Sequence, residues 1–335
     1  MRPAIASPAG LLLGVILAGW TALAASPDLQ LAVGLKISNS IAFFSLKGEP
    51  IASVPVGTRP HEVVLSPDGK NLYVADNGML WMTDKGPGGN TISIVDLLHH
   101  RKIGVIDLGE HRRPHGLGVL PRTGNLVVTV ENPDGLLLVD PKARTVLRTF
   151  DTRGTSPHML TVGADGEYVY VSNARSGNVS AVHLATGKVT LIPTGARPQG
   201  GVISADGRTF YVTNSDENSI SIIDLESKKV VGTIATGKGP GRVVLSPDGK
   251  QLFYNLEPDQ AVGFADVAAR RQTSVVRLPG PPLSLVPSRD GKRIYSGIQS
   301  QDTVVVLSVD DHRIVGSFKT PHESGPDAVL EVPLH

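Results

Sequence analysis

Residues 196–237 read ARPQGGVISADGRTFYVTNSDENSISIIDLESKKVVGTIATG, and this stretch predicts four short β-strands. Its apolar runs are separated by polar turns and cover residues 200–204, 209–213, 219–224 and 229–235. Asp206-Gly207 lies in the first turn, where both residue types accept the backbone angles of a tight reversal. The stretch therefore predicts one four-stranded antiparallel unit.

The same unit recurs along the chain, and a proline step introduces each copy. The steps are Arg59-Pro60, Arg113-Pro114, Ser156-Pro157, Arg197-Pro198, Gly239-Pro240, Gly280-Pro281 and Gly325-Pro326. From the second step onward the prolines recur every 41 to 45 residues. A period of about 40 to 45 residues filled with short strands is typical of the four-stranded blades of a β-propeller.

Both ends of the chain are needed to count the blades. Residues 58–325 hold six complete repeats, residues 28–57 read as three strands without a first one, and residues 327–332 read as a first strand alone. Joining the two ends removes open sheet edges. We therefore predict an all-β fold, a seven-bladed β-propeller of four-stranded antiparallel blades closed by strands from both termini, with blade links near residues 58, 112, 155, 196, 238, 280 and 325.

The N-terminus has the pattern of a signal peptide. Arg2 precedes an apolar run over residues 9–20, and Ala22-Leu23-Ala24 offers the small residues that a signal peptidase requires. We expect residues 1–24 to be removed and residues 25–335 to form the propeller, in the periplasm or outside the cell. The apolar run is shorter than the roughly 20 residues of a spanning helix. An uncleaved N-terminal anchor is the alternative.

Composition narrows the possible chemistry. The chain has no cysteine, which excludes disulfides, thiol nucleophiles and iron–sulfur clusters. Its formal charge is +1 and its aromatic content is 4%, so neither a basic field nor a long stacking surface favours nucleic acid as a partner. We expect a monomer without a membrane span after signal cleavage, whose partner is a small molecule, a metal ion or another protein.

Three histidines follow the proline of consecutive steps and make the channel mouth the candidate site. His61, His115 and His158 begin the inner strands of adjacent blades and are predicted to lie around one side of the mouth. Imidazoles bind transition metals, so copper, zinc or iron is the candidate ion. The alternative is that these polar residues only form hydrogen bonds with backbone groups and water. The fold does not demand histidine, because the equivalent residues elsewhere are Gln199, Gly241, Pro282 and Asp327.

Other charged residues are expected on the same rim. Arg59, Arg113 and Arg197 precede the prolines and are candidate ligand-binding cations. The carboxylates of Glu62, Asp76 and Glu131 are expected near the histidines, because a His beside a carboxylate can act as acid or base. The adjacent pair His99-His100 falls in a turn on the opposite face, and we expect it to be solvated.

One insertion, residues 78–89, interrupts the first repeat between its second and third strands. It carries Met79, Trp81 and Met82 before the run Gly86-Pro87-Gly88-Gly89. Long loops in compact domains are commonly functional, so we predict an apolar flap over the histidines with Trp81 as a ligand contact. The alternative is a surface loop whose Trp81 packs on the neighbouring blade.

The strand-end motif carries a family resemblance. Tyr211-Val212-Thr213-Asn214, with variants at Tyr170-Val171-Ser172-Asn173 and Tyr73-Val74-Ala75-Asp76, resembles the YVTN family of β-propeller repeats over essentially the whole mature chain. Propellers of this type resemble lactonase-like enzymes, cytochrome d1-like domains and plain binding modules. The resemblance therefore implies the fold and leaves open whether the chain is an enzyme.

Three functions follow from this resemblance and the rim. The first is a secreted binding or scaffold protein that takes a small anion, a metal ion or a partner peptide. The second is a lactonase-like hydrolase with His115 and Glu131 as candidate catalytic residues and with Glu62, Asn132 and Asn173 as further candidate ligands. The third is a redox-linked protein with a tetrapyrrole or copper, although cytochrome d1-like domains usually have one blade more.

Overall fold

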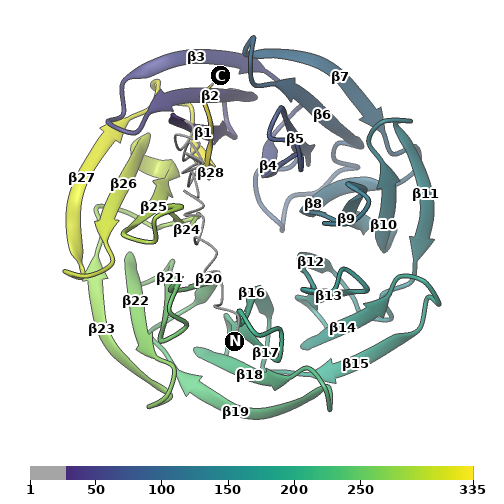
Figure 1. Cartoon of the computed structure of the whole chain (residues 1–335), viewed down its shortest axis with the longest axis vertical. Helices are drawn as coiled ribbons and strands as arrows, with labels where there is room; N and C mark the ends of the chain where they lie inside the picture. The colour runs from purple at the N-terminus through teal and green to yellow at the C-terminus, as the bar shows by residue number, and fades with distance from the viewer. Residues whose placement is uncertain (1–27, 335) are drawn as a thin grey trace, which may run out of the picture.

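The computed structural model describes residues 28–334, in which seven four-stranded antiparallel sheets form a closed ring (Figure 1). The signal peptide expected at residues 1–24 lies outside these described residues. Each sheet runs outward from the central channel, as a propeller blade does. The prediction of an all-β, seven-bladed β-propeller is confirmed.

In six of the seven blades the strands are hydrogen-bonded in chain order from the channel to the perimeter, and the closing blade begins instead with the C-terminal strand. The inner strands are β4 (Pro60–Leu65), β8 (Arg112–Val119), β12 (Pro157–Val162), β16 (Pro198–Ile203), β20 (Pro240–Leu245), β24 (Val286–Pro287) and β28 (Pro326–Pro333). The second strands are β1 (Leu29–Leu35), β5 (Asn71–Asp76), β9 (Leu126–Asn132), β13 (Tyr168–Asn173), β17 (Thr209–Asn214), β21 (Gln251–Leu256) and β25 (Arg293–Ile298).

The remaining strands complete the blades toward the perimeter of the ring. The third strands are β2 (Ser40–Ser45), β6 (Thr91–Asp96), β10 (Asp134–Asp140), β14 (Asn178–His183), β18 (Ser219–Asp224), β22 (Ala261–Asp266) and β26 (Thr303–Ser308). The outer strands are β3 (Pro50–Pro55), β7 (Arg101–Asp107), β11 (Thr145–Phe150), β15 (Val189–Pro193), β19 (Lys229–Ala235), β23 (Arg271–Arg277) and β27 (Arg313–Lys319).

The closing blade combines both ends of the described chain. Its strand order is β28-β1-β2-β3, so the C-terminal strand β28 is innermost and pairs antiparallel with β1. Gln30 reinforces this pairing, because its side-chain amide donates to the carbonyl of Pro333 at 3.0 Å. The predicted closure by strands from both termini is confirmed.

The sequence pattern of each strand follows its place in the blade. Second and third strands are buried nearly throughout, because apolar side chains of neighbouring blades cover both of their faces. Most outer strands expose more than half of their residues to solvent, as β19 and β23 do. The inner strand β24 is only two residues long, because Pro281 and Pro282 before it lack the N–H groups that a ladder needs.

The Thr-Asn end of the strand motif joins neighbouring blades. The hydroxyl of Thr213 lies within hydrogen-bond distance of the carbonyl oxygen of Gly200 in its own blade and of that of Gly241 in the next, and its one hydrogen is available to either. Asn214 accepts from the N–H of Gly195 in the preceding link at 3.2 Å and donates to Ser221 at 2.9 Å. The motif therefore holds the blade links in place, and its role here is structural.

Asp76 and Asn173, which were expected near the site, end the second strands of their blades as Asn214 does. Asp76 accepts hydrogen bonds from the N–H of Gly57 and from the hydroxyl of Ser93. Asn173 donates to Ser180 at 2.7 Å and is fully buried. Asp76 is thus not a partner of the histidines, and the contacts of Asn173 are those of a blade link rather than of the channel.

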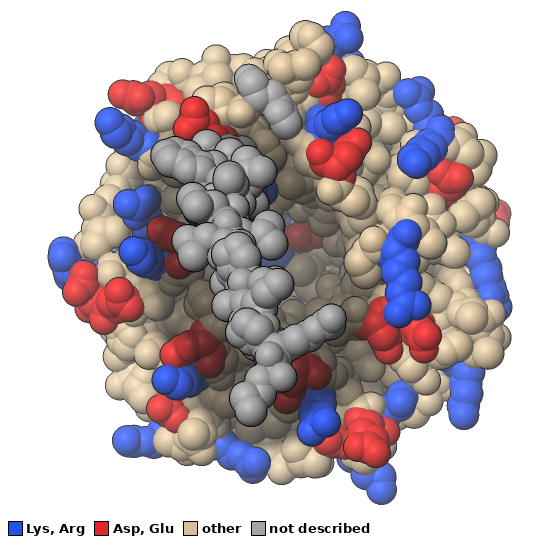
Figure 2. All heavy atoms as spheres, viewed as in Figure 1, with Lys and Arg blue, Asp and Glu red and all other residues tan. Residues whose placement is uncertain are grey.

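The surface charge matches the near-zero net charge of the chain. Lysine and arginine side chains are interspersed with aspartate and glutamate around the propeller face in Figure 2, and the ring is hollowed at its centre. Within residues 28–334, no helix is long and apolar enough to cross a membrane.

Candidate functional site

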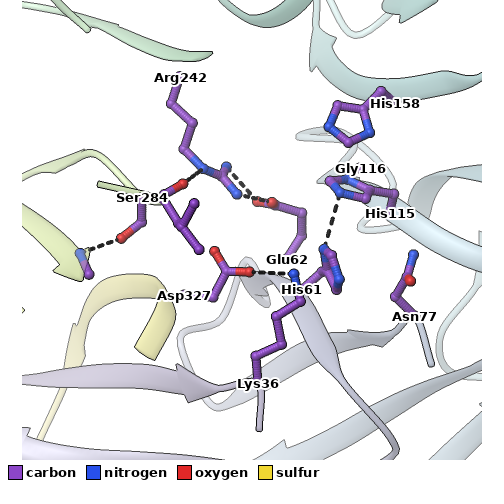
Figure 3. A network of polar contacts seen from close by, with 12 residues as sticks. Lys36, His61, Glu62, Asn77, His115, Gly116, His158, Arg242, Ser284 and Asp327 are labelled. Atoms are coloured by element: carbon purple, nitrogen blue, oxygen red, sulfur yellow. Dashed lines mark hydrogen bonds and ion pairs between the residues drawn. The ribbon is translucent and has the colours of Figure 1, made fainter. Parts of the chain in front are cut away.

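The inner strands and the link before β24 bring seven residues to one end of the channel. Each is the residue that follows the proline of a blade link, and together they are His61, His115, His158, Gln199, Gly241, Pro282 and Asp327. The three histidines lie side by side in Figure 3, with Asp327 nearby. The predicted juxtaposition of the histidines is therefore present.

Hydrogen bonds fix the tautomers of the first two histidines. Nε2 of His61 lies 3.0 Å from the carbonyl oxygen of Met79, which can only accept, so this nitrogen carries the hydrogen. The pKa of His61 is lowered to about 3, chiefly by burial and then by Lys36, so the ring is neutral and its Nδ1 is an acceptor. Nε2 of His115, at 3.1 Å, must then donate to it.

His115 consequently holds an unused lone pair inside the protein. Its Nδ1 is buried and has no hydrogen-bond partner. Burial, followed by the neighbouring His158 and His61, lowers the pKa of His115 well below its ordinary value. Neither nitrogen of His115 is open to the channel, so the predicted catalytic role of this residue has no exposed atom to act through.

His158 is the histidine with an open nitrogen. Its ring stacks on His115 with centroids 3.8 Å apart, and its Nδ1 lies 3.4 Å from Oε1 of Glu131. A carboxylate can only accept, so Nδ1 of His158 carries a hydrogen, and in the neutral form of the ring Nε2 is the acceptor. Arg113 lies 4.0 Å from the other oxygen of Glu131. Of the histidines, His158 is the one that contacts a carboxylate of the predicted set, Glu131.

A buried ion pair forms the next part of the rim. Nζ of Lys36 lies 3.2 Å from Oδ2 of Asp327, and both side chains are about 5% exposed. Burial opposes ionisation of Asp327, but Lys36, His61 and Arg242 outweigh it and hold the pKa of the carboxyl below its ordinary value. Asp327 is therefore ionised near neutral pH, and its charge is compensated.

A second ion pair crosses the channel. Both terminal nitrogens of Arg242 on β20 bind the carboxylate of Glu62 on β4, and its Nε donates to the carbonyl of Leu283 at 2.9 Å (Figure 3). Burial opposes the charge of Arg242, but Glu62 outweighs it and raises the pKa of the guanidinium. The carboxylate of Glu62 is thus held by Arg242 rather than by a histidine.

These groups surround a cavity of about 270 Å³ at the channel mouth. The triad of histidines, Lys36, Arg242 and Asp327 contribute to its wall. The rest of the wall includes Asn77, Glu131, Met159, Arg197, Gln199, Gly200, Gly241, Asn255, Glu257 and Leu283. The cavity lies on the histidine side of the ring, where the sequence placed the site.

The insertion at residues 78–89 covers this cavity. Met79, Leu80, Trp81, Met82 and Thr83 all line it. Met79 is 8% exposed, whereas Trp81 is 46% exposed with its ring 5.8 Å from the ammonium of Lys36. The insertion therefore lies over the histidines as a flap, and Trp81 contacts the closing blade as well as the cavity.

Arg113 fastens the flap. Its Nη2 donates to the carbonyl of Asp84 at 2.9 Å and to that of Gly86 at 2.7 Å. Arg113 does not line the cavity, and its backbone φ of 56° is one that L-residues rarely adopt. The contacts of Arg113 are those of a latch residue for the flap, in place of the predicted role as a ligand-binding cation.

The other two predicted arginines differ from each other. Arg59 donates to the carbonyls of Lys36 and Ile37 and does not line the cavity. Arg197 does line it, at the exposed rim, and lies 3.4 Å from Asp216. Only Arg197 is thus placed to meet a ligand directly.

The remaining predicted residues lie away from the cavity or take other partners. Asn132 is exposed and lines a neighbouring surface groove. His99 is 57% exposed and bonds Asp96 at 2.9 Å, as expected of a solvated residue. His100 was expected to be solvated too, but its ring packs on Phe43 and bonds Gln30 at 3.0 Å, because the turn folds it back onto the closing blade.

Sequence reasoning missed three charged or polar residues of the wall. Arg242 lies two positions after a proline, Lys36 follows the second strand of the closing blade, and Asn255 is the penultimate residue of β21. A buried carboxylate requires a cation as its partner. The only signal for Lys36 and Arg242 is therefore that Asp327 and Glu62 would each need such a partner once buried.

The histidine triad does not converge on a common point. Within residues 28–334, no group of three or more His, Asp or Glu side chains has an arrangement that could hold a metal ion. The rings of His61 and His115 bond each other instead. The transition-metal site expected here stays a prediction, and elemental analysis of the purified protein is its test.

Comparisons with known proteins agree on the architecture. No protein-family model and no curated protein matches the chain. Among solved structures it is similar to the periplasmic gluconolactonase PpgL of Pseudomonas aeruginosa, with 17% identity, a TM-score of 0.74 and coverage of 92% of this chain and 99% of that one. A functionally unknown protein of Desulfotomaculum acetoxidans has 13% identity, a TM-score of 0.76 and coverage of 91% and 99%.

Two further similar structures come from redox proteins. Dihydro-heme d1 dehydrogenase NirN, solved in complex with DHE, has 16% identity, a TM-score of 0.69 and coverage of 91% of this chain and 76% of that one. Hydrazine synthase of Kuenenia stuttgartiensis has 20% identity, a TM-score of 0.68 and coverage of 83% and 97%. At these identities the likeness establishes the class, a seven-bladed β-propeller, whose functions are diverse.

Proposed function

We propose that this chain is a periplasmic propeller that binds a small molecule in the cavity beneath its flap. The observation that carries the proposal is the cavity itself, which collects buried polar and charged side chains from five blades under an apolar cover. Concave sites with a few convergent polar groups are the usual location of ligands. Burying so many polar groups costs folding free energy. A channel with a purely structural role does not require such groups.

The size of the cavity selects among the possible ligands. A volume of about 270 Å³ lies just below the usual range of ligand pockets, which run from about 300 to 1,000 Å³. A sugar-sized metabolite fits this space better than a folded peptide does. The periplasmic location rests on the signal-peptide pattern of residues 1–24 and accords with the printed location of the similar gluconolactonase.

A tetrapyrrole does not fit this site well. The cavity is small, both ring nitrogens of His61 are hydrogen-bonded, and the free Nδ1 of His115 is buried. His158 is the one histidine of the three with an open nitrogen. We therefore derive no redox step for this chain from its likeness to a dihydro-heme d1 dehydrogenase.

Hydrolysis of a cyclic ester is the second candidate function. The specific observation that favours it is the contact of His158 with Glu131, because a carboxylate that orients an imidazole is a common general-base arrangement. In this scheme Nε2 of His158 takes a proton from a water molecule as that water attacks the ester carbonyl. Turnover of five- and six-membered lactones, lost in His158→Phe and retained in His99→Phe, is the expected result if the candidate holds.

The primary proposal is tested by blocking the cavity. Met159 is half-buried on the inner strand β12 and lines the cavity, so Met159→Trp fills part of the space. Leu98→Trp is the matched control, since Leu98 is 57% exposed in a distant turn. A library of small polar compounds is screened by thermal shift against the three proteins. Stabilising compounds shared by wild type and Leu98→Trp but lost in Met159→Trp support the proposal, and their absence contradicts it.

A further inference from the structure

The charges of the cavity wall define the kind of ligand that it accepts, given the binding function proposed above. Its buried charges are already compensated, since Lys36 pairs with Asp327 and Arg242 pairs with Glu62. Glu131 has Arg113 and His158 as neighbours. The wall has two further charged residues, Arg197 and Glu257, which are exposed at the rim and have opposite signs, and Arg197 lies 3.4 Å from Asp216.

A charged ligand would disturb this balance. A carboxylate or phosphate in the cavity would lie among Glu131 and Asp327 with no free buried cation to pair with it. An ammonium group would lie beside the cations Lys36 and Arg242. Burying an uncompensated charge costs several kcal/mol, so both kinds of ligand are disfavoured.

The wall offers both a donor and an acceptor to an uncharged ligand. The ammonium of Lys36 has three N–H groups, and Asp327 is the one carboxylate that it contacts within the described residues. Nε2 of His158 is the open acceptor, because Glu131 holds the hydrogen of the ring at Nδ1. A hydroxyl group of the ligand can accept a hydrogen bond from the ammonium of Lys36 and donate one to Nε2 of His158.

We infer that the ligand is an uncharged, hydroxyl-rich molecule of about monosaccharide size, and that one of its hydroxyls donates to Nε2 of His158. The flap contributes Trp81 and Met82 as apolar cover, which suits the carbon face of such a molecule. This inference departs from the small anion expected from the rim arginines, because Arg59 and Arg113 do not line the cavity.

Three probes that share one ring test the inference. D-glucose, D-glucuronate and D-glucosamine are titrated at pH 6, where they are neutral, anionic and cationic, into wild type, His158→Phe and His99→Phe. We expect glucose to bind at least tenfold more tightly than the two charged probes. His158→Phe should lose at least tenfold in glucose affinity and remain folded by circular dichroism, and His99→Phe should bind as wild type does.

The outcomes separate this inference from the binding function on which it rests. Binding of glucuronate or glucosamine as tight as that of glucose overturns the inference, as does an unchanged affinity in His158→Phe. Failure of all three probes, while other compounds from the thermal-shift screen occupy the cavity, overturns the hydroxyl class and leaves the binding function standing. If no compound of the screen is sensitive to Met159→Trp, the binding function itself is wrong.

Discussion

Arg242 binds Glu62 from a blade on the far side of the ring. The two residues are 180 positions apart in the chain, and their blades are separated by two others in one direction and three in the other. Neighbouring blades are joined by many contacts, whereas this ion pair is a direct link across the channel. Arg242 lines the cavity and Glu62 does not, so the pair also fixes one cation at the cavity wall.

Breaking this link should destabilise the protein substantially. Glu62→Gln leaves the largely buried guanidinium of Arg242 without its carboxylate, and removing one partner of a buried pair costs about 3–5 kcal/mol. Urea unfolding of the variant measures the loss. Lys250→Ala is the control, because its ion pair with Asp248 is exposed and such pairs contribute about 0–1 kcal/mol. Equal, small losses in both variants would show that the pair does not bind the blades together.

The neutral histidines should make stability depend on pH. The pKa of His61 is about 3 in the folded protein against an ordinary 6.5, so below pH 6.5 the unfolded chain takes up a proton that the folded one does not. Stability therefore falls on acidification between these values, by about 1.4 kcal/mol per pH unit for the ring. In His61→Gln, which preserves a donor and an acceptor, the slope should be smaller by that amount.

His99→Gln is the control for this slope, because His99 is exposed. Comparing variant with wild type is necessary because Asp76 acts in the opposite sense. Burial raises the pKa of Asp76 to about 6, so its contribution grows on acidification below that value. Unfolding free energies at pH 4.5, 5.5 and 6.5 supply the slopes. A slope in His61→Gln equal to that of wild type would mean that His61 is not held neutral.

Replacing Asp76 with asparagine should make the folded protein more stable at pH 8. The equivalent Asn214 makes the same link contacts with a neutral amide, including the bond from the N–H of Gly195. Because the folded carboxyl has the higher pKa, its cost appears as pH rises through about 6. Asp76→Asn should thus gain up to about 3 kcal/mol at pH 8 and nothing near pH 3.5.

The converse variant Asn214→Asp provides the matched control for this prediction. It should lose stability at pH 8 and recover it as the pH falls below about 5, since a buried carboxylate is costly until protonated. Chemical unfolding at both pH values gives the differences. A loss of stability in Asp76→Asn at pH 8 would show that the ionised carboxylate is required at this link.

Sequence periodicity predicted the fold because every blade repeats the same local sequence features. The proline steps, the tight turns and the Thr-Asn strand ends each act within one blade or between neighbours, so a single repeat reveals them. The grouping of His61, His115 and His158 followed for the same reason. Residues at one position of successive repeats must meet around the channel.

The pairings within the site could not be predicted in this way. Glu62 and Arg242 meet across the ring, and no repeat relates them. The choice between His115 and His158 depends on which ring nitrogens are occupied, which only the three-dimensional contacts decide. Arg113 was expected to meet a ligand, but its guanidinium donates to carbonyls of the flap.

Releasing the latch should loosen the flap and leave the propeller intact. Arg113→Met removes the bonds to the carbonyls of Asp84 and Gly86, so the amides of residues 79–88 should exchange hydrogen at least tenfold faster. Arg148→Met is the matched control, because Arg148 binds two carbonyls of a neighbouring blade away from the flap. Hydrogen-exchange mass spectrometry makes the comparison. Unchanged protection of the flap in Arg113→Met would show that other contacts hold it closed.

The methionine methyl groups test the central claim most directly, namely that the flap-covered cavity binds an uncharged ligand. The chain has four methionines, and the three beyond Met1, which are Met79, Met82 and Met159, all line the cavity. Protein labelled with ¹³C at the methionine methyls is titrated with D-glucose and with the uncharged compounds found by thermal shift. The account predicts saturable shifts of these three signals in wild type and Leu98→Trp. Saturable binding by calorimetry with all three signals unmoved would contradict it.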